Sequence, residues 1–365
     1  MARFPNGNGF LYFLFWEKPM LLVLIILFIL IAVLPLFVKQ VEQNVEIFLL
    51  IMGIAAAAVS GMLTPAHLLL VFQDQFLYII TAAVFLVSLI FRVLEAHVKA
   101  FVNTLLDHLS LKLIVFLLVV CLGLISSIIT AIIAALLLVE IVSILPLDNK
   151  SKVRVSVVSC FSIGLGAVLT PIGEPLATIV TSKLHQHFLY MFQLLGGYSI
   201  VGVVLLGLLS MVFVDENWRA KFSENDEVMV IPEKEDMRTI GIRTGKIFMF
   251  VVALELLGMG FKPVIDTYII HWSNDLLYAA NMVSAILDNA TLAAAEIDPV
   301  MGTVQIKAIL ISLLVSGGML VTGNIPNIVT AAKLKISMKQ WAWVGLPIGA
   351  VLLVGYYLVL FVVHI

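Results

Sequence analysis

Five acidic residues lie within apolar stretches of this sequence: Glu140, Glu174, Glu255, Asp288 and Glu296. A carboxylate in hydrocarbon is costly, so each is a candidate functional group. Glu174 lies between a glycine and Pro175, where a continuous helix is hard to sustain because proline lacks a backbone donor. A carboxylate at such a point could bind a cation or a proton. The alternative is that Glu174 caps the N-terminus of the following helix.

The second acidic motif is Asp288-Asn289, followed by Thr291. Carboxylate, amide and hydroxyl oxygens are hard ligands that suit a dehydrated alkali cation. Asp and Asn also cap helices well, so capping is again the alternative. We therefore predict an alkali-cation site formed by Glu174, Asp288 and Asn289, with the Thr291 hydroxyl nearby. No other cofactor is expected.

The elements that must position these groups are two interrupted apolar segments. Residues 152–184 are interrupted at 166–175, and residues 303–335 are interrupted at 317–327. Backbone groups freed inside a membrane are tolerated where they line a cavity, and a matched pair of interruptions is typical of a secondary-transporter binding site. Neither interruption contains Lys or Arg. Their polar residues are further candidate ligands: Thr170, Thr322, Asn324 and Asn327.

The composition indicates a polytopic membrane protein. Of the 365 residues, 62% are hydrophobic and 12% are charged, and the mean hydropathy is +1.14; these values differ from those of globular domains. Apart from the interrupted segments, the expected membrane spans are 19–38, 44–63, 76–96, 190–214, 244–261 and 341–363. We interpret the first of them as a helix, since it lacks the short core and cleavage site of a signal peptide.

Two further apolar windows, 111–145 and 264–298, are interpreted as re-entrant hairpins. Under this topology sixteen of the 21 Lys and Arg residues face the cytoplasm, as the positive-inside rule favours, and both termini lie outside. The first hairpin carries Ser126, Ser127 and Thr130 near its middle, and the second carries Asp288. The first set of hydroxyls either lines the site or bonds its own helix backbone.

The two halves then form an inverted repeat. The predicted organisation is an N-terminal two-helix segment at 1–75, a first repeat at 76–214, a cytoplasmic linker at 215–243 and a second repeat at 244–365. Residues 175–184 and 326–334 echo one another, from Pro175 and Pro326 to Lys183 and Lys333. The polar linker reads as a solvated connection between the halves.

The remaining candidates have weaker signals. Glu140, near the exit of the first hairpin, and Glu255, in mid-helix, are candidate proton relays, whereas Glu296 is expected at the outer surface. Cys121 and Cys160 lie in apolar windows and are expected to pack rather than form a disulfide. A net charge of −2 without a dense basic cluster predicts no nucleic-acid partner. The seven histidines show no metal-binding spacing.

The motifs resemble those of the ion transporter superfamily, within it the NhaD-type sodium/proton antiporters. The run Ser284 to Asn289 looks like that family's Ser-Ala-x-x-Asp-Asn hairpin, and the run Gly166 to Glu174 looks like its Gly-Ala-Trp-Thr-Pro-Ile-Gly-Asp break. The run 323–327 is closer to the Gly-x-x-Pro-Asn break of arsenite-pump relatives. Uncharacterised cation transporters of the superfamily are also similar. The resemblance covers about residues 110–340.

This resemblance implies an all-α inverted-repeat transporter with two hairpins and two broken helices, an elevator-like mechanism and a homodimer in the inner membrane. The expected function is exchange of a cation, Na⁺ or Li⁺, for protons. The chain is shorter than typical members, and Glu174 replaces their Asp, which would change cation preference. The first alternative is an anion carrier for arsenite or a carboxylate, which the acidic residues disfavour. An intramembrane enzyme is a second alternative, but the sequence has no His-Glu-x-x-His or Gly-x-Ser-x-Gly motif, and a membrane scaffold would leave the paired breaks without a purpose.

Overall fold

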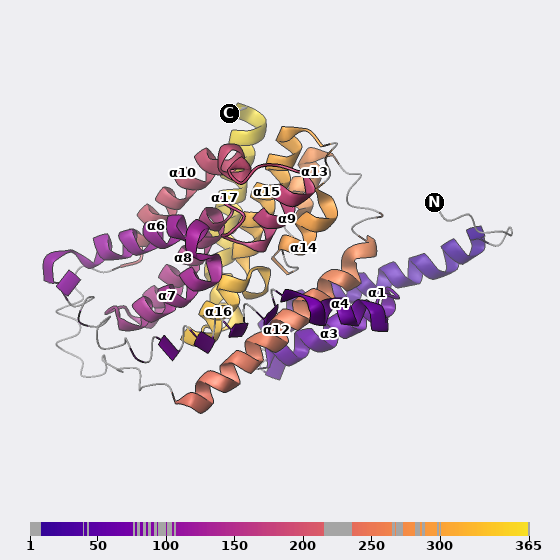
Figure 1. The fold of residues 1–365 in the computed structure, drawn as a ribbon, viewed down its shortest axis with the longest axis horizontal. Coiled ribbons are helices and arrows are strands. Elements are labelled where there is room, and N and C mark those ends of the chain that lie inside the picture. The colour runs from indigo at the N-terminus through magenta and orange to yellow at the C-terminus, as the bar shows by residue number, and fades with distance from the viewer. Residues whose placement is uncertain are drawn as a thin grey trace.

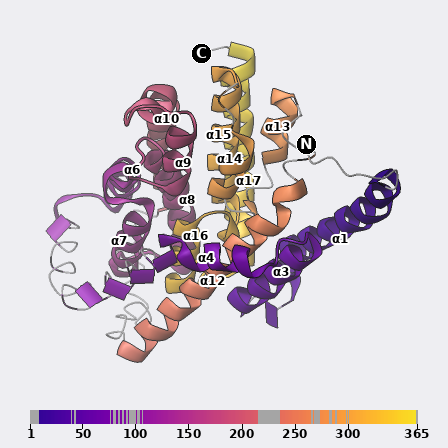
Figure 2. The same cartoon turned by 45° about the vertical axis from the view of Figure 1, so that its right-hand side comes forward.

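A computed structural model describes residues 9–38, 40–41, 44–75, 77–78, 107–214, 236–264, 273–281, 285–286, 289–297 and 301–363, with scattered residues between 81 and 105 and at 267 and 299. Every regular element in these ranges is helical, which confirms the prediction of an all-α protein. The arrangement is shown in Figures 1 and 2. Most of the predicted span 76–96, and linker residues 215–235, lie outside the described part of the chain.

The central bundle is formed from two successive groups of helices. The first group is α6 (Leu111–Ile129), α7 (Ala131–Ile144), α8 (Asn149–Ala167), α9 (Pro175–Lys183) and α10 (Tyr190–Val212). The second is α13 (Asn274–Ala280), α14 (Asn289–Glu296), α15 (Thr303–Met319), α16 (Ile325–Leu334) and α17 (Met338–Tyr357), with a 3₁₀ turn η3 (Val321–Gly323) and a π-helical extension η4 (Leu358–Val363). Both predicted interruptions therefore coincide with helix ends.

A flanking layer contains α1 (Gly9–Phe37), α3 (Val45–Val59), α4 (Pro65–Gln73) and α12 (Met237–Val264). Helices α3 and α12 pack extensively against each other. A side chain at Gly53 would meet the Ala253 carbonyl at 2.9 Å, and one at Gly260 would meet the Ala56 backbone at 2.6 Å. Small residues allow this close approach of helices, as is common in membrane proteins.

Helix α12 starts earlier than the sequence indicated. Its first residue is Met237, so the last residues assigned to the linker are helical. The Asp236 carboxylate accepts the backbone N–H of Thr239 at 2.8 Å. A side-chain acceptor of this kind satisfies one of the unpaired donors in the first turn of a helix, which explains a helical start in a polar stretch.

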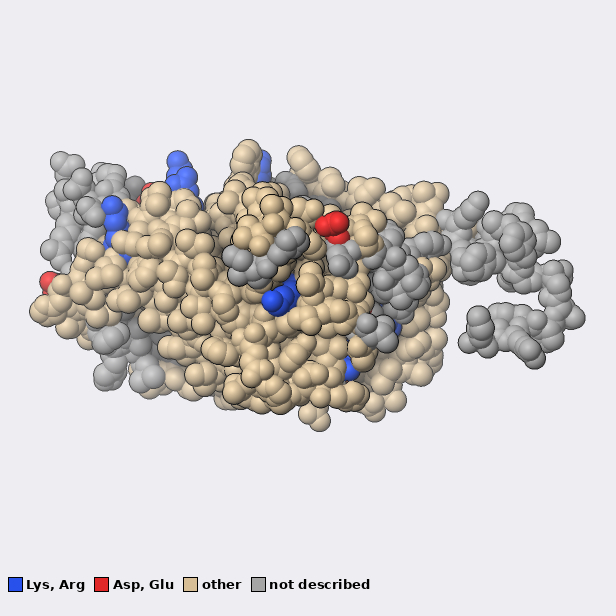
Figure 3. Space-filling view, turned by 90° about the horizontal axis from the view of Figure 1, so that it is seen from above, with Lys and Arg blue, Asp and Glu red and all other residues tan. Residues whose placement is uncertain are grey.

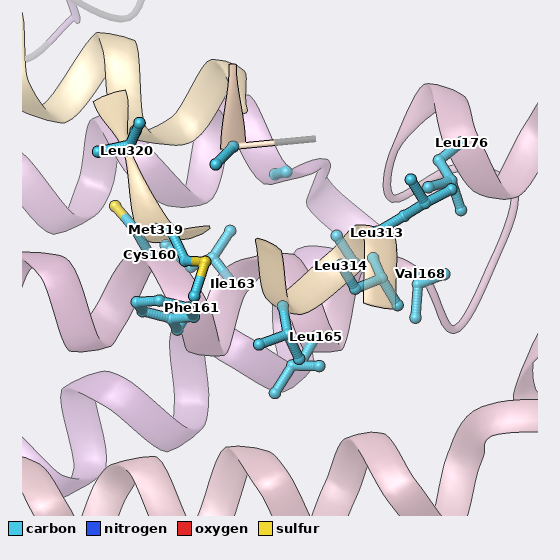
Figure 4. Packing of buried hydrophobic residues seen from close by; sticks show 14 of the residues in the cluster. Cys160, Phe161, Ile163, Leu165, Val168, Leu176, Leu313, Leu314, Met319 and Leu320 are labelled. Carbon is cyan, nitrogen blue, oxygen red and sulfur yellow. The ribbon is translucent and has the colours of Figure 1, made fainter. Parts of the chain in front are cut away.

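The core of the bundle is built on α8 and α15. Almost every side chain of α15 from Ile306 onward, and of α8 from Val155 onward, is buried. Figure 4 shows Phe161 and Leu165 of α8 beside Leu314 and Met319 of α15. Three of the four serine hydroxyls of α8 donate to backbone carbonyls, as Ser162 does to the Val119 carbonyl of α6 at 2.9 Å. The fourth, the buried Ser156 hydroxyl, has no hydrogen-bond partner among the described residues. A polar helix can therefore occupy the centre of the bundle.

Contacts between the two groups follow a reciprocal pattern. Helix α9 of the first group packs against α14 of the second, and α16 of the second packs against α7 of the first, while α8 and α15 pack on each other. Each short helix that follows an interruption thus contacts a helix of the other group. The two interruptions are brought into one bundle by this exchange.

The described residues include four helical stretches long and apolar enough to cross a membrane: Leu111–Ile129, Tyr190–Val212, Met237–Val264 and Met338–Val363. The face in Figure 3 is largely uncharged, with only separated Lys, Arg, Asp and Glu side chains. These features are those of a membrane protein. Because α6 alone is long enough to span, the re-entrant reading of window 111–145 stays a prediction.

Candidate functional site

The first interruption is bonded to the turn between α6 and α7. Helix α8 ends at Ala167 and α9 begins at Pro175. Between them, the Thr170 hydroxyl donates to the Ser127 carbonyl, and the Gly173 carbonyl accepts the Ala131 N–H at 2.8 Å. A side chain at Gly173 would overlap the Ala167 carbonyl, so this close turn requires glycine. Thr170, Ser127 and Thr130 are thereby brought together.

Thr130 forms the turn itself in an unusual conformation. Its φ is 77°, a region that β-branched residues rarely adopt and that costs energy. Its hydroxyl oxygen accepts the Ile133 N–H at 3.4 Å, as the N-cap of α7. Thr130 is the residue of this turn that faces the first interruption. Because backbone strain often occurs at functional sites, Thr130 is a candidate for a functional role.

Glu174 lies at the end of the first interruption and is only 5% exposed. Its backbone carbonyl accepts the Thr178 N–H at 3.4 Å, in the first turn of α9. The Thr178 hydroxyl donates to the Pro171 carbonyl. The carboxylate is therefore inside the fold, at the N-terminal end of a short helix, where the helix dipole favours negative charge.

The second interruption is bonded to the other apolar window. The Thr322 hydroxyl donates to the Ala285 carbonyl at 2.9 Å, which parallels the bond between Thr170 and Ser127. The Asn327 amide nitrogen donates to the carbonyls of Gly317 at 2.7 Å and Leu320 at 2.8 Å. The Asn327 carbonyl oxygen is buried without a hydrogen-bond partner among the described residues.

Asn324 caps the helix that follows this interruption. Its side-chain oxygen accepts the N–H of Ile325 at 2.8 Å, at the start of α16. Its amide lies close to α8, 3.6 Å from the position a Gly164 side chain would take. Asn324 is therefore the N-cap of α16, and it also lies beside the central helix α8.

Asn289 is the first residue of α14 and is buried, and its amide nitrogen has no hydrogen-bond partner within the described ranges. Asp288 lies outside the described residues, as does the side chain of Thr291. The proposed pairing of Glu174 with Asp288 thus stays a prediction. Helix α14 packs on α9, which brings the helix after Asp288 beside the helix after Glu174.

Ser126 and Ser127 bond the helix backbone. The Ser126 hydroxyl lies 3.1 Å from the Ile163 carbonyl of α8, and the Ser127 hydroxyl donates to the Leu124 carbonyl at 2.7 Å. This is the alternative in which the hydroxyls satisfy carbonyls instead of lining a site. Each hydroxyl uses its single proton in this way, while its oxygen lone pairs stay able to accept a proton or bind a cation, so the lining of a site by these residues stays a prediction.

Of the three remaining acids, Glu296, Glu140 and Glu255, only Glu296 differs from its expected position. Glu296 was expected at the outer surface, but the structure places it at the end of α14 with 2% exposure; it is enclosed because α14 packs against α9 and α15. Glu140 forms an ion pair with Lys333 of α16. Glu255 is half-buried in α12.

Sequence reasoning missed the partners of these groups. Lys333 appeared only as part of the internal echo, yet it joins α16 to α7. Thr178 was not singled out at all. The sequence did contain one signal for Thr178. Thr178 and Asn327 both lie near the start of the two similar segments, 175–184 and 326–334, each of which follows an interruption. Across the described residues no three His, Cys, Asp or Glu side chains gather as a metal cluster, and Cys121 and Cys160 are free thiols.

The comparison with curated proteins gives no match. A family model described as a protein of unknown function, DUF1646, matches residues 21–363. The match includes both interruptions, both turn regions and the helices that pack around them. The chain therefore belongs to the DUF1646 family.

Proposed function

We propose that this protein is a secondary active transporter that exchanges a cation, Na⁺ or Li⁺, for protons. The observation that carries the proposal is the buried Glu174 carboxylate at a helix interruption inside an apolar helical protein. A buried acid in such a place is a functional group by default, because its desolvation must be compensated by a partner, a proton or an ion.

Asp288, Asn289 and Thr291 complete the proposed site with hard oxygen ligands. The reciprocal contacts of α9 with α14 and of α16 with α7 support a single site shared by both halves. They also support the inverted-repeat interpretation, since they are the pairs that a twofold relation would exchange. Thr170 and Asn327 shape the two interruptions, and Asn324 caps the second short helix.

The proposed coupling is competition between a cation and protons. The ionised carboxylates bind the cation, and their protonation releases it. Two acids that share one ion titrate as a pair. Exchange is therefore faster at alkaline pH, where the empty site is deprotonated and available to the cation. No chemical conversion of substrate is involved, so the protein is not an enzyme in this proposal.

We propose an elevator-like movement of the bundle that contains the interruptions against the layer formed by α1, α3 and α12. The tight packing of α3 on α12 at Gly53 and Gly260 supports a rigid scaffold. In this proposal the protein is a homodimer in the inner membrane, and the scaffold layer supplies the dimer contact.

The test is cation-driven proton flux in proteoliposomes, with Na⁺, Li⁺, K⁺ and Ca²⁺ supplied in turn. Glu174→Gln and Asp288→Asn should each abolish flux, because either removes a charge from the site. Asp275→Asn is the control, since this acid is exposed on α13 and its variant should exchange like the wild type.

An absence of proton flux with every cation, in a protein that is folded and inserted, would reject the antiporter. The second candidate is then an anion carrier. It is favoured by the second interruption, which has amide and hydroxyl groups but no acid and lies at the N-terminus of the short helix α16. The N-terminus of a helix stabilises an anion. Uptake of arsenite or a carboxylate that survives Glu174→Gln would support it.

A further inference from the structure

A groove of about 690 Å³ opens on the side of the bundle between α10, the start of α15 and the second half of α17. It lies apart from both interruptions. Its walls are aliphatic side chains and glycines, and its polar side chains are Gln193, Tyr198, Lys307 and Tyr356. Since α10 and α17 are both long and apolar enough to cross a membrane, the groove opens toward lipid.

Missing side chains create the space. Nothing lies within 4 Å of the position a side chain would take at Gly197 of α10 or at Gly355 of α17. Beside them, Val201 is 58% exposed and Val351 is 72% exposed. The Tyr356 hydroxyl donates to the Tyr198 carbonyl at 2.9 Å, which joins α17 to α10. The groove is therefore an open, mostly apolar depression on the surface, which runs along α10 and α17.

One cation lies in this groove. The Lys307 ammonium is 3.3 Å from the Tyr198 hydroxyl and 5.0 Å from the centre of its ring. Among the described residues it forms no ion pair with a carboxylate. Lys307 is half-buried, and a partly desolvated ammonium without a counter-ion favours an anionic ligand group.

The length of the groove indicates that the apolar part of this ligand is an acyl chain. The lining residues on α10 run from Gln193 to Leu205, and twelve residues of helix rise about 18 Å. Half of a hydrocarbon core about 30 Å thick is about 15 Å. From Tyr198, beside the Lys307 ammonium, to Leu205 the groove is about 10 Å long. It therefore holds about two thirds of an acyl chain of one leaflet and matches it in polarity.

We infer that this groove binds an anionic phospholipid, with an acyl chain along α10 and α17 and the phosphate against Lys307 and the Tyr198 hydroxyl. The inference does not depend on the proposed transport function. This groove differs from the general lipid contact of an apolar helix in two ways. Lys307 gives a position for the phosphate, and the space at Gly197 and Gly355 gives a position for the acyl chain.

The experiment is a titration of the full-length protein in detergent, followed by native mass spectrometry, with phosphatidylglycerol and phosphatidylcholine of identical acyl chains. Wild type should bind phosphatidylglycerol more tightly. Lys307→Gln should weaken phosphatidylglycerol about fivefold, the equivalent of about 1 kcal/mol for one basic residue, and leave phosphatidylcholine unchanged. Lys339→Gln, an exposed lysine in the first turn of α17, is the charge-matched control and should have no effect.

A second pair of variants tests the chain position. Gly197→Leu fills the groove and should reduce binding of both lipids, whereas Gly241→Leu adds the same side chain at an open position of α12 and should not. Equal affinity of the wild type for the two lipids, or equal effects of Lys307→Gln and Lys339→Gln, would overturn the inference. So would a Gly197→Leu protein that binds lipid normally but differs from the wild type in oligomeric state, because the occupant would then be a second copy of the chain.

Discussion

The two helix interruptions share a plan but differ in charge and in closure. Each is bonded by a threonine hydroxyl, Thr170 or Thr322, to a carbonyl of the apolar window before it. The first ends in the Glu174 carboxylate, and its Ile172 side chain is 52% exposed. The second has no acid, and residues 320–324 are buried throughout.

The freed carbonyls are satisfied differently in the two places. At the first interruption one hydroxyl, from half-buried Thr178, bonds the Pro171 carbonyl. At the second, the buried Asn327 amide bonds two carbonyls at once. The first interruption therefore carries the acidic side chain, whereas the second is closed by side-chain donors, two hydrogen bonds from the Asn327 amide and one from the Trp341 indole to the Gly318 carbonyl.

The largest effect is expected from removing that amide. Asn327→Ala removes the side-chain donor of the buried Gly317 carbonyl, at about 1–3 kcal/mol. It also removes one of two donors of the Leu320 carbonyl, at about 0.5–1.5 kcal/mol, because the Gly323 N–H at 3.3 Å remains. The expected loss of stability is about 2–4 kcal/mol. Thr178→Val removes one hydroxyl at the first interruption and should cost about 1–2 kcal/mol. Thermal unfolding in detergent gives the order. Equal losses for the two variants would show that the second interruption is no more closed than the first.

A smaller difference in stability is expected between an ion pair of the central bundle and an ion pair of the flanking layer. Glu140 and Lys333 are 14% and 10% exposed, whereas Lys246, paired with Glu46 at 2.6 Å, is 47% exposed. A double-mutant cycle with Glu140→Gln and Lys333→Met should give a coupling of about 1–3 kcal/mol. The cycle with Glu46→Gln and Lys246→Met should give about 0–1 kcal/mol, because water screens an exposed lysine.

The cycles are measured by unfolding of the same detergent-solubilised preparations. A coupling at Glu140 and Lys333 no larger than at Glu46 and Lys246 would mean that this ion pair does not join α16 to α7 energetically. The reciprocal contacts between the halves would then rest on apolar packing alone.

The smallest effect is expected at the turn that faces the first interruption. Thr130→Gly should stabilise the protein by about 1 kcal/mol, because glycine adopts the positive φ of this residue without strain and replaces a capping threonine at a cost of only a few tenths. Thr130→Ala, the matched control, loses the cap and keeps the strain, so it should destabilise by about 1 kcal/mol. If both variants melt alike, the turn stores no strain.

The position of the interruptions was readable from the sequence. Glycine and proline act on their own backbone, so Gly173 with Pro175, and Gly323 with Pro326, predicted the ends of helices that the structure places there. The division of the first apolar window near Thr130 was predicted as well. Whether that window re-enters or spans, and whether the halves are related by inversion, remain predictions.

The candidate site was only partly readable. The sequence identified Glu174 and Asn327 as residues of interest, but not that Asn327 closes two carbonyls or that Glu140 meets Lys333. Glu296 was misplaced, because a position near the end of an apolar window does not reveal whether another helix covers it. Asp288, the second acid of the proposed site, lies outside the described residues.

The sequence alone determined the membrane class, the all-helical fold and the places where helices stop, because these depend on composition and on the local properties of each backbone. Only the tertiary structure decided which interruption is closed, which carbonyl each side chain satisfies and which helices of the two halves meet. Those contacts join residues such as Cys160 and Thr330, or Tyr198 and Tyr356, that are more than a hundred positions apart. Packing, which no local pattern records, brings them together.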